Sequence, residues 1–500
     1  MNSYWIDSVP NILEEHKSLD DDLEVDVCIV GGGITGITCA YLLSKHGFKV
    51  ALLEKDLLAC KTTGNTTGKI TSQHGLFYKY LIDTFGFDSA KSYLDANEFA
   101  IKNIKEIIKT NNIDCDFSIQ DAYVYTQDEK EIQKIKDEVK AVNSLGFNSE
   151  FVANIPLPIS DVKGAIRFPS QAQFHPRKYL TALCEIIKEN NGDIFENSRV
   201  YDVKNEKDSY IAYTKNNKVK SKYVILATRY PIINFPGFYF LKMYQEMSYI
   251  IGVETNSKLF DGMYISNGSP TLSFRTTDYN GKQLLLIAGM QHKVGAKIDL
   301  ENAYNVLENT AKSLYPDAKI VYRWQTEDSI SLDKIPYIGE FSELMSNMYV
   351  ATGFKKWGMT SSNLAANIIT DKILGNENPY EETFLSTRFH PIKNKEEFGN
   401  ILKESTYSLV INKFKIPDES LNEVKNDEGK IIEVDGKKVG VYRNSDGKIF
   451  AIKPKCTHLG CELSWNNLEK TWDCPCHGSR FDYTGKNIYD PAIKNLEKFL

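Results

Sequence analysis

Features that would mark a membrane protein or a nucleic-acid-binding protein are absent from this sequence. No apolar run approaches the roughly 18 residues that a membrane span needs. The N-terminal stretch MNSYWIDSVPNILEEHK has neither a basic segment followed by an apolar one nor a twin arginine. No stripe of Lys and Arg is present, and 60 basic residues against 66 acidic ones leave a net charge of −6. We therefore expect a cytoplasmic protein with no membrane span and no nucleic-acid partner.

Cysteine is sparse over most of the chain. Of the 9 cysteines, four lie between residues 456 and 476, and the others are scattered singly. Single cysteines in a reducing compartment are usually small core residues. We interpret the scattered ones in this way: Cys28, Cys39, Cys60, Cys115 and Cys184. The C-terminal group requires another explanation.

Two short boxes combine the C-terminal cysteines with histidines. Residues 456–461 read CTHLGC, and residues 474–479 read CPCHGS. A [2Fe–2S] cluster takes two ligands per iron, and imidazoles on one iron raise its reduction potential above that of an all-cysteine cluster. A structural zinc site is the alternative. Zinc knuckles usually present Cys-x2-Cys pairs, and the boxes hold too many candidate ligands for one zinc, so the pattern favours an iron–sulfur cluster.

The boxes resemble those of Rieske proteins of the respiratory cytochrome type. The resemblance implies that Cys456 and Cys474 bind one iron, and that His458 and His477 bind the other. Strand-like runs separated by Asp-Gly turns precede the boxes, between residues 430 and 452, and this pattern predicts consecutive hairpins. We therefore expect a small all-β Rieske domain over residues 406–500.

Two further implications follow from the Rieske resemblance. One is a disulfide between Cys461 and Cys476 that clamps the two loops, a pair that Rieske oxygenases and ferredoxins lack. The other concerns Phe481, which stands where the respiratory family has a tyrosine whose hydroxyl donates to a cluster-ligating sulfur. Because such hydrogen bonds stabilise the reduced cluster, this replacement predicts a lower reduction potential than in the respiratory proteins.

A dinucleotide-binding pattern occupies the other end of the chain. Residues 24–30 have the pattern of a buried strand and lead directly into Gly31-Gly-Gly33-Ile-Thr-Gly36. An apolar helix follows, and a second strand ends at Glu54. Gly31 permits a tight turn, Gly33 lets the backbone approach a pyrophosphate, and Gly36 lets helix and strand pack closely. The helix N-terminus faces the phosphates, and Glu54 can accept the ribose hydroxyls.

Three later segments decide between FAD and NAD. Residues 62–75 are rich in Thr and Gly, residues 222–228 read KYVILAT, and residues 347–360 form a strand, a glycine loop and a helix start. In this order they resemble flavoproteins of the D-amino-acid-oxidase superfamily, which implies bound FAD. The implied cofactor-binding residues are Gly31, Gly33, Gly36, Glu54, Lys55, Thr67, Gly68, Lys69, Ile70, Val200, Thr228, Gly353, Trp357, Gly358, Met359 and Thr360.

The order of these motifs predicts the domain organisation of the 500 residues. The fold class is α/β: a Rossmann-like FAD-binding domain with an interleaved α+β substrate subdomain, followed by the all-β Rieske domain. The oxidoreductase domain covers residues 1–375. Its flavin-binding parts are expected at about 20–80, 165–240 and 331–375, its substrate or cap subdomain at about 81–164 and 241–330, and a linker at 376–405.

The substrate is less clear from the sequence. No second GxGxxG is present, so the electrons are not expected to come from NAD(P)H. Tyr249, Arg275, His292 and Trp357 are candidate catalytic residues, although Arg275 fits a surface ion pair equally well. The superfamily resemblance implies oxidation of an amine or amino acid, with electrons passing singly to the cluster and on to an external one-electron carrier. The alternative is an electron-transfer or redox-sensing protein without an organic substrate.

Overall fold

A computed structural model describes residues 2–15, 17–296, 301–388, 399 and 421–499. Its first sheet is built around a central strand, β1 (Leu23–Val30). This strand is buried on both faces, which explains the nearly continuous apolar run at residues 25–30. It is flanked in parallel by β2 (Val50–Leu53) and β10 (Lys218–Leu226); beyond these, β7 (Asp193–Phe195) runs parallel to β2 and β17 (Met348–Thr352) runs parallel to β10. In spatial order the sheet contains β16 (Tyr337–Glu340), β17 (Met348–Thr352), β10 (Lys218–Leu226), β1 (Leu23–Val30), β2 (Val50–Leu53) and β7 (Asp193–Phe195), with β9 (Ser209–Tyr213) and β8 (Asp202–Glu206) added antiparallel to β10.

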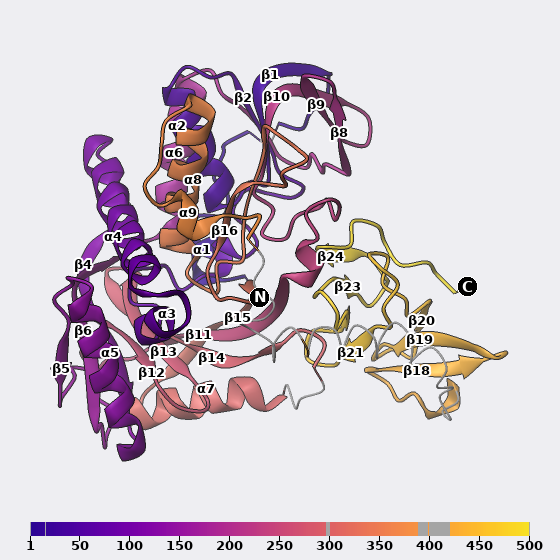
Figure 1. The fold of residues 1–500 in the computed structure, drawn as a ribbon. Helices are drawn as coiled ribbons and strands as arrows, with labels where there is room; N and C mark the ends of the chain where they lie inside the picture. The colour runs from indigo at the N-terminus through magenta and orange to yellow at the C-terminus, as the bar shows by residue number, and fades with distance from the viewer. Residues whose placement is uncertain (1, 16, 297–300, 389–398, 400–420, 500) are drawn as a thin grey trace.

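Helices that are far apart in the sequence cover one face of this sheet. They are α2 (Ile34–Lys45), α6 (Pro176–Glu189) and α8 (Gly358–Leu374), and α2 contacts both of the others. Figure 1 shows them side by side along β1 and β10. The largest apolar core lies between these helices and the sheet, and a second core lies on the β8–β9 side. This is the Rossmann-like arrangement that the glycine loop predicts.

The second sheet forms the predicted α+β subdomain. In spatial order it contains β15 (Lys319–Ser331), β11 (Met243–Glu254), β14 (Lys282–Lys293), β13 (Leu272–Tyr279), β12 (Met263–Ser266), β4 (Ser118–Thr126), β6 (Gly164–Gln173) and β3 (Lys69–Ile70), with β5 (Glu150–Val152) beside β6. The accompanying helices are α3 (Tyr78–Phe85), α4 (Phe87–Thr110), α5 (Ile132–Ser144) and α7 (Glu301–Leu314). Strands β3 and β6 belong to this sheet although the sequence placed their residues mainly in the flavin-binding parts.

Two small antiparallel sheets form the C-terminal domain, drawn in yellow in Figure 1. One contains β18 (Glu428–Val434), β19 (Lys437–Arg443) and β20 (Ile449–Ile452), and the other β21 (Ser464–Asn466), β22 (Thr471–Asp473), β23 (Arg480–Asp482) and β24 (Asn487–Tyr489). The predicted hairpins are present, with turns at Asp435–Gly436 and at residues 444–448. Short elements elsewhere are α1 (Tyr4–Ser8), α9 (Glu381–Phe384), η1 (Thr63–Asn65), η2 (Glu129–Glu131), η3 (Tyr239–Leu241) and η5 (Leu421–Glu423).

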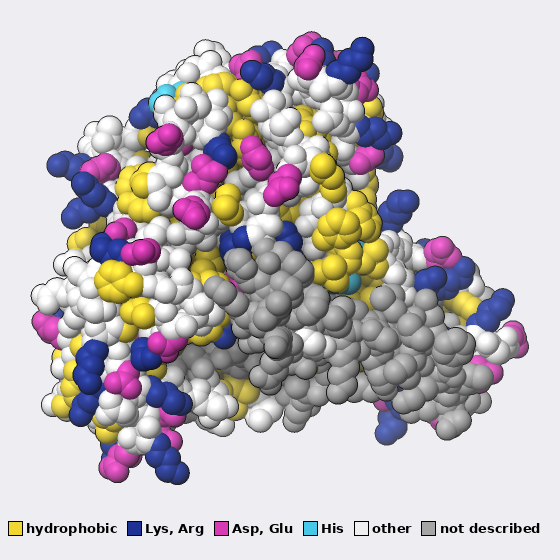
Figure 2. All heavy atoms as spheres, viewed as in Figure 1, with side chains coloured by type: hydrophobic (Ala, Val, Ile, Leu, Met, Phe, Trp, Pro, Cys, Tyr) yellow, Lys and Arg dark blue, Asp and Glu magenta, His cyan; other side chains and the backbone are white. Residues whose placement is uncertain are grey.

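Most of the predicted linker 376–405 lies outside the described residues. Its beginning, up to residue 388, packs against the first domain: Phe384 is buried, and Arg388 forms an ion pair with Asp333 at 2.7 Å. Among the described helices, none is both long enough and apolar enough to cross a bilayer. On the face shown in Figure 2, acidic and basic side chains are interspersed rather than gathered by sign.

Candidate functional site

The loop between β1 and α2 is tight because its glycines leave no room for side chains. Gly31 has a φ of +113°, and a Cβ there would lie 2.6 Å from the carbonyl oxygen of Ala227. A Cβ on Gly36 would lie 2.0 Å from the carbonyl oxygen of Gly31. Gly33 and Ile34, at the N-terminus of α2, line a cavity. Backbone N–H groups at such a helix end suit a pyrophosphate.

Glu54 stands at the end of β2 and lines the same cavity. Its carboxylate accepts hydrogen bonds from the N–H groups of Gly32, at 2.7 Å, and Asp56, at 2.9 Å. Burial raises the pKa of Glu54, while these two N–H groups oppose the rise. A carboxylate has about four acceptor sites, so Glu54 can still receive hydroxyl donors from the cavity.

The cavity, of about 320 Å³, lies between the loops of the first sheet, the second sheet and the C-terminal domain. Most of the predicted cofactor-binding residues line it: Gly31, Gly33, Glu54, Lys55, Thr67, Lys69, Val200, Thr228, Gly353, Trp357, Gly358 and Met359. The remaining predicted residues do not: Gly36, Gly68, Ile70 and Thr360. Gly36 and Gly68 instead shape the backbone, because a Cβ on either would collide with neighbouring atoms.

The segment from β17 to α8 brings Trp357 to the cavity wall. Trp357 precedes the first residue of α8, and its ring stacks on His74 with centroids 4.6 Å apart. His74 is fully enclosed: its ring nitrogens lie 2.7 Å from the Tyr93 hydroxyl and 2.8 Å from the Thr71 carbonyl oxygen. Burial lowers the pKa of His74 to about 3, so the ring is neutral. With both nitrogens engaged, His74 supports Trp357 and does not itself line the cavity.

Arg275, a candidate substrate residue, is buried and does not line the cavity. Its Nη1 donates to the carbonyl oxygens of Thr67 and Gly68, both at 2.8 Å, and its Nε donates to the carbonyl of Thr276 at 3.1 Å. Burial lowers the pKa of Arg275 to about 9, so it stays charged at neutral pH. These bonds hold the turn at Gly68, and the buried guanidinium does not line the cavity where a substrate would bind.

The candidates Tyr249 and His292 also lie outside the cavity lining. They contact each other, with 3.1 Å between the Tyr249 hydroxyl and Nε2 of His292, and Nδ1 of His292 lies 2.9 Å from the Lys293 carbonyl oxygen. Burial lowers the pKa of His292. This pair is a satisfied polar contact within the second sheet. Trp357 is the one member of the predicted catalytic set that lines the cavity.

Asp328 and Lys356 are among the charged residues of the cavity wall that the sequence analysis missed. Asp328 on β15 lines the cavity, and no hydrogen bond or ion pair to its carboxylate is formed within the described part of the chain. Burial raises the pKa of Asp328 to about 6, against the lowering effect of Lys356. Lys356 is itself bound to Glu246 at 2.8 Å and to Ser248 at 3.1 Å. The polar run 325–329 within a long strand was the available signal.

The two C-terminal boxes bring the predicted cluster ligands together. The thiols of Cys456 and Cys474 are buried and close enough to hydrogen-bond each other. The rings of His458 and His477 lie 5.0 Å apart, and Nδ1 of each is buried without a hydrogen-bond partner in the described part of the chain. Burial lowers the pKa of His458 to about 4 and that of His477 to about 3. Two thiols and two neutral, unpartnered imidazole nitrogens are the donor set that a Rieske cluster requires.

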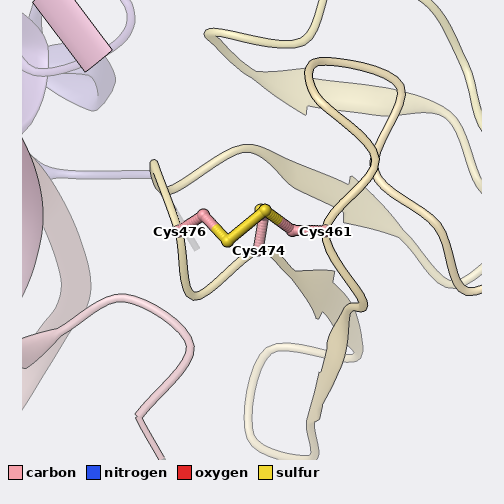
Figure 3. Close-up of side chains that lie close together, drawn as sticks. All are labelled: Cys461, Cys474 and Cys476. Atoms are coloured by element: carbon pink, nitrogen blue, oxygen red, sulfur yellow. A yellow bond between two sulfur atoms is a disulfide. The ribbon is translucent and has the colours of Figure 1, made fainter. Parts of the chain in front are cut away.

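The predicted disulfide joins Cys461 to Cys476 and ties the two boxes together. Figure 3 shows it beside the side chain of Cys474, and ligand atoms of these three cysteines lie within 4.8 Å of one another. Because Cys461 and Cys476 are bonded to each other, only Cys474 of the three offers a free thiol. The disulfide is therefore a clamp beside the cluster site and supplies no ligand.

One segment of the first domain reaches both sites, and we call residues 228–242 the bridging segment. It follows β10, and its first two residues line the cavity. Further along, the Oδ1 atom of Asn234 lies 2.7 Å from Nε2 of His458. The ring of Phe240 meets that of His477 edge-on at 5.9 Å. The histidine side of the cluster site therefore faces the first domain.

The C-terminal domain also contributes to the cavity itself. Tyr489, Asp490 and Ile493 line it. Asp490 forms ion pairs with Lys55 at 2.7 Å and with Arg199 at 3.8 Å. Burial raises the pKa of Asp490, but these cations outweigh it, so the pKa is lowered overall. The two domains therefore share one wall, at the end of the cavity near Lys55.

Comparisons with known proteins agree with this geometry. Residues 26–372 match the FAD dependent oxidoreductase family, and residues 415–500 match the Rieske [2Fe-2S] domain.

Individual similar proteins match different shares of the chain. A Rieske 2Fe-2S iron-sulfur protein, YhfW, of Bacillus subtilis (strain 168) is 39% identical over 99% of this chain and 97% of its own length. Gamma-glutamylputrescine oxidoreductase of Escherichia coli (strain K12) is 22% identical over 76% of this chain and 90% of its own. Glycine oxidase from Geobacillus kaustophilus shares the fold, with a TM-score of 0.62, 18% identity, and coverage of 74% of this chain and 100% of its own.

Proposed function

Because the chain belongs to the FAD-dependent oxidoreductase family and carries a Rieske domain, we propose that it oxidises an amine and relays the electrons to its own cluster. The first domain binds FAD and the second binds a [2Fe–2S] cluster. When bound, FAD accepts two electrons from an organic substrate, and the cluster carries them one at a time. An external one-electron carrier is the final acceptor in this proposal.

The bridging segment is the observation that carries the relay. Its first residues, Thr228 and Arg229, line the cavity, and Asn234 bonds His458 six residues after Thr228. The same covalent stretch of backbone therefore connects the flavin cavity to a cluster histidine. Phe240 covers the other histidine, His477. This arrangement favours electron transfer inside one chain over transfer between chains.

The charges of the cavity support an amine as the substrate. Every cationic side chain in its lining already has a partner. Lys55 and Arg199 pair with Asp490, Lys61 with Asp56, Arg229 with Glu327, Lys356 with Glu246, and Lys69 with the Tyr264 carbonyl and Ser273. Asp328 lines the cavity, and none of the described residues pairs with its carboxylate. A cationic substrate group therefore meets a complementary charge, whereas a substrate carboxylate would have to displace an existing pair.

Asp328 has a chemical role in this proposal. Its carboxylate binds the substrate ammonium and takes one proton from it, which leaves the neutral amine whose adjacent C–H bond can be oxidised. A pKa of about 6 suits this transfer near neutral pH. The names of two similar proteins, gamma-glutamylputrescine oxidoreductase and glycine oxidase, refer to substrates that carry amino groups.

Rapid anaerobic mixing of the loaded protein with a panel of amines and amino acids tests the proposal. We expect at least one amine to bleach the flavin, and the EPR signal of the reduced cluster to follow with a first-order rate that does not change with protein concentration. A rate that scales with protein concentration would contradict the internal relay. If the whole panel leaves the flavin oxidised while a reduced carrier protein reduces it, the chain is an electron-transfer protein instead.

A further inference from the structure

Tyr230, in the bridging segment, has a hydroxyl that the fold leaves unused. The side chain is 1% exposed, and its oxygen has no hydrogen-bond partner among the residues that the structure describes. The backbone around it is held firmly: its N–H donates to the Thr228 carbonyl at 2.6 Å, and the Thr228 hydroxyl donates to the Tyr230 carbonyl at 2.7 Å. A buried hydroxyl that makes no hydrogen bond costs about 1–3 kcal/mol, so a native fold rarely keeps one without a reason.

The surroundings of Tyr230 belong to the cluster site. Its ring meets that of His458 edge-on, with centroids 6.2 Å apart. The pKa of Tyr230 is raised, first by burial and then by the negative charges of the Cys474 and Cys456 thiolates, while Arg229 opposes them. The ring contact with His458 places the Tyr230 side chain on the cluster side of the bridging segment, where the sulfurs of Cys456 and Cys474 also lie. A tyrosine hydroxyl can donate to such a sulfur.

We propose that the Tyr230 hydroxyl donates a hydrogen bond to a sulfur of the cluster, so that the flavin domain itself helps to set the cluster's reduction potential. Within the Rieske domain, the hydroxyl of Ser479 already bonds the Cys456 sulfur, whereas Phe481 has no donor to offer. Tyr230 supplies a donor from across the domain interface. The potential of the cluster then depends on docking of the two domains.

The direction of the effect follows from charge. A donor to sulfur stabilises the reduced cluster, which carries one more negative charge, and therefore raises the potential. Replacing Tyr230 with phenylalanine keeps the ring that packs on His458 and removes only the donor. We expect the equilibrium between the oxidised and the reduced cluster to shift about tenfold toward the oxidised form, which is about 59 mV for a one-electron couple.

The test is a redox titration of the full-length, loaded Tyr230→Phe protein with dithionite and mediators, followed by EPR. Tyr239→Phe is the matched control, because Tyr239 is a buried tyrosine of the same segment whose hydroxyl bonds the Phe341 carbonyl at 3.0 Å. We expect a lower potential for Tyr230→Phe only. An unchanged potential, or an equal shift in both variants, overturns the proposal.

A second measurement detects the donated proton itself rather than its effect on the potential. Electron–nuclear double resonance on the reduced native protein, in H₂O and in D₂O, reports exchangeable protons coupled to the cluster. The Ser479 hydroxyl gives such a coupling in every variant, and we expect a further one that the native protein and Tyr239→Phe share and that Tyr230→Phe lacks. A spectrum that is the same with and without the Tyr230 hydroxyl contradicts the proposal. Chemical reduction is used throughout, so neither result depends on the substrate or on the proposed relay.

Discussion

Arg275 is predicted to stabilise the flavin-side turn and to have no contact with the substrate. The perturbation is Arg275→Met, which keeps most of the side-chain volume and removes the guanidinium. In the native fold this group donates to the carbonyl oxygens of Thr67 and Gly68, both at 2.8 Å. Without it, the Thr67 carbonyl loses its donor and the Gly68 carbonyl keeps only the N–H of Phe174, at 3.3 Å, so the turn that presents Thr67 to the flavin is held less firmly.

The magnitude follows from two opposing effects. The Thr67 carbonyl, left without a partner, costs about 1–3 kcal/mol, and the Gly68 carbonyl adds less because it keeps the Phe174 N–H. Against this, the variant no longer buries a cation. In the native protein that burial is unfavourable, and for this reason it lowers the pKa of Arg275 to about 9. We expect a net loss of about 2 kcal/mol. At about 2 °C per kcal/mol for a large domain, the unfolding temperature falls by about 4 °C.

The assay combines thermal unfolding, the FAD content of the purified protein, and steady-state kinetics. We expect Arg275→Met to lose FAD and thermal stability while the remaining loaded protein keeps its KM. Arg167→Met is the control, since Arg167 is partly exposed and pairs with Asp121 and Glu150 at the surface, where such pairs contribute little. The reasoning is refuted if Arg275→Met keeps its FAD and its unfolding temperature but raises KM for a carboxylate-bearing substrate tenfold or more.

Three further outcomes are expected. Gly31→Ala abolishes FAD binding because its Cβ has no space, whereas Gly47→Ala, also at positive φ but in open space, keeps the flavin. With an amine substrate, kcat/KM rises as the pH rises through about 6, because the Asp328 carboxylate must lose its proton to bind the ammonium, and Asp328→Asn removes this limb of the profile. The double substitution of Cys461 and Cys476 by alanine lowers the stability of the Rieske domain by about 3 kcal/mol, as expected for a 15-residue loop. The assay is the rate at which cluster absorbance is lost on heating: it rises in the variant, and an unchanged rate would contradict the prediction.

The fold class and both cofactors were predicted correctly from the sequence, because their signals are local. The glycine loop joins one strand to the next helix, and each cluster box places a cysteine and a histidine within four residues of each other. The spacing of residues within one loop is the same in any fold that contains that loop. The disulfide between Cys461 and Cys476 followed from the same boxes through their resemblance to Rieske proteins.

The substrate side could not be predicted in the same way. Arg275, Tyr249 and His292 all lie on strands of the second sheet, where alternate residues face opposite sides. Which side faces the cavity depends on the sheet packed against it and on irregularities of register, such as the one between Met247 and Tyr249. The sequence patterns of these strands carry neither piece of information.

The sequence by itself therefore determined that this chain is a flavoprotein with a Rieske cluster, since contiguous residues hold the chemistry of each cofactor. Only the tertiary structure decided how the two sites meet. Asn234 and His458 lie 224 positions apart in the chain, and the ring of Tyr230 meets that of His458 only because the domains are docked. Contacts of this kind arise from the complementarity of folded surfaces, which no local spacing encodes.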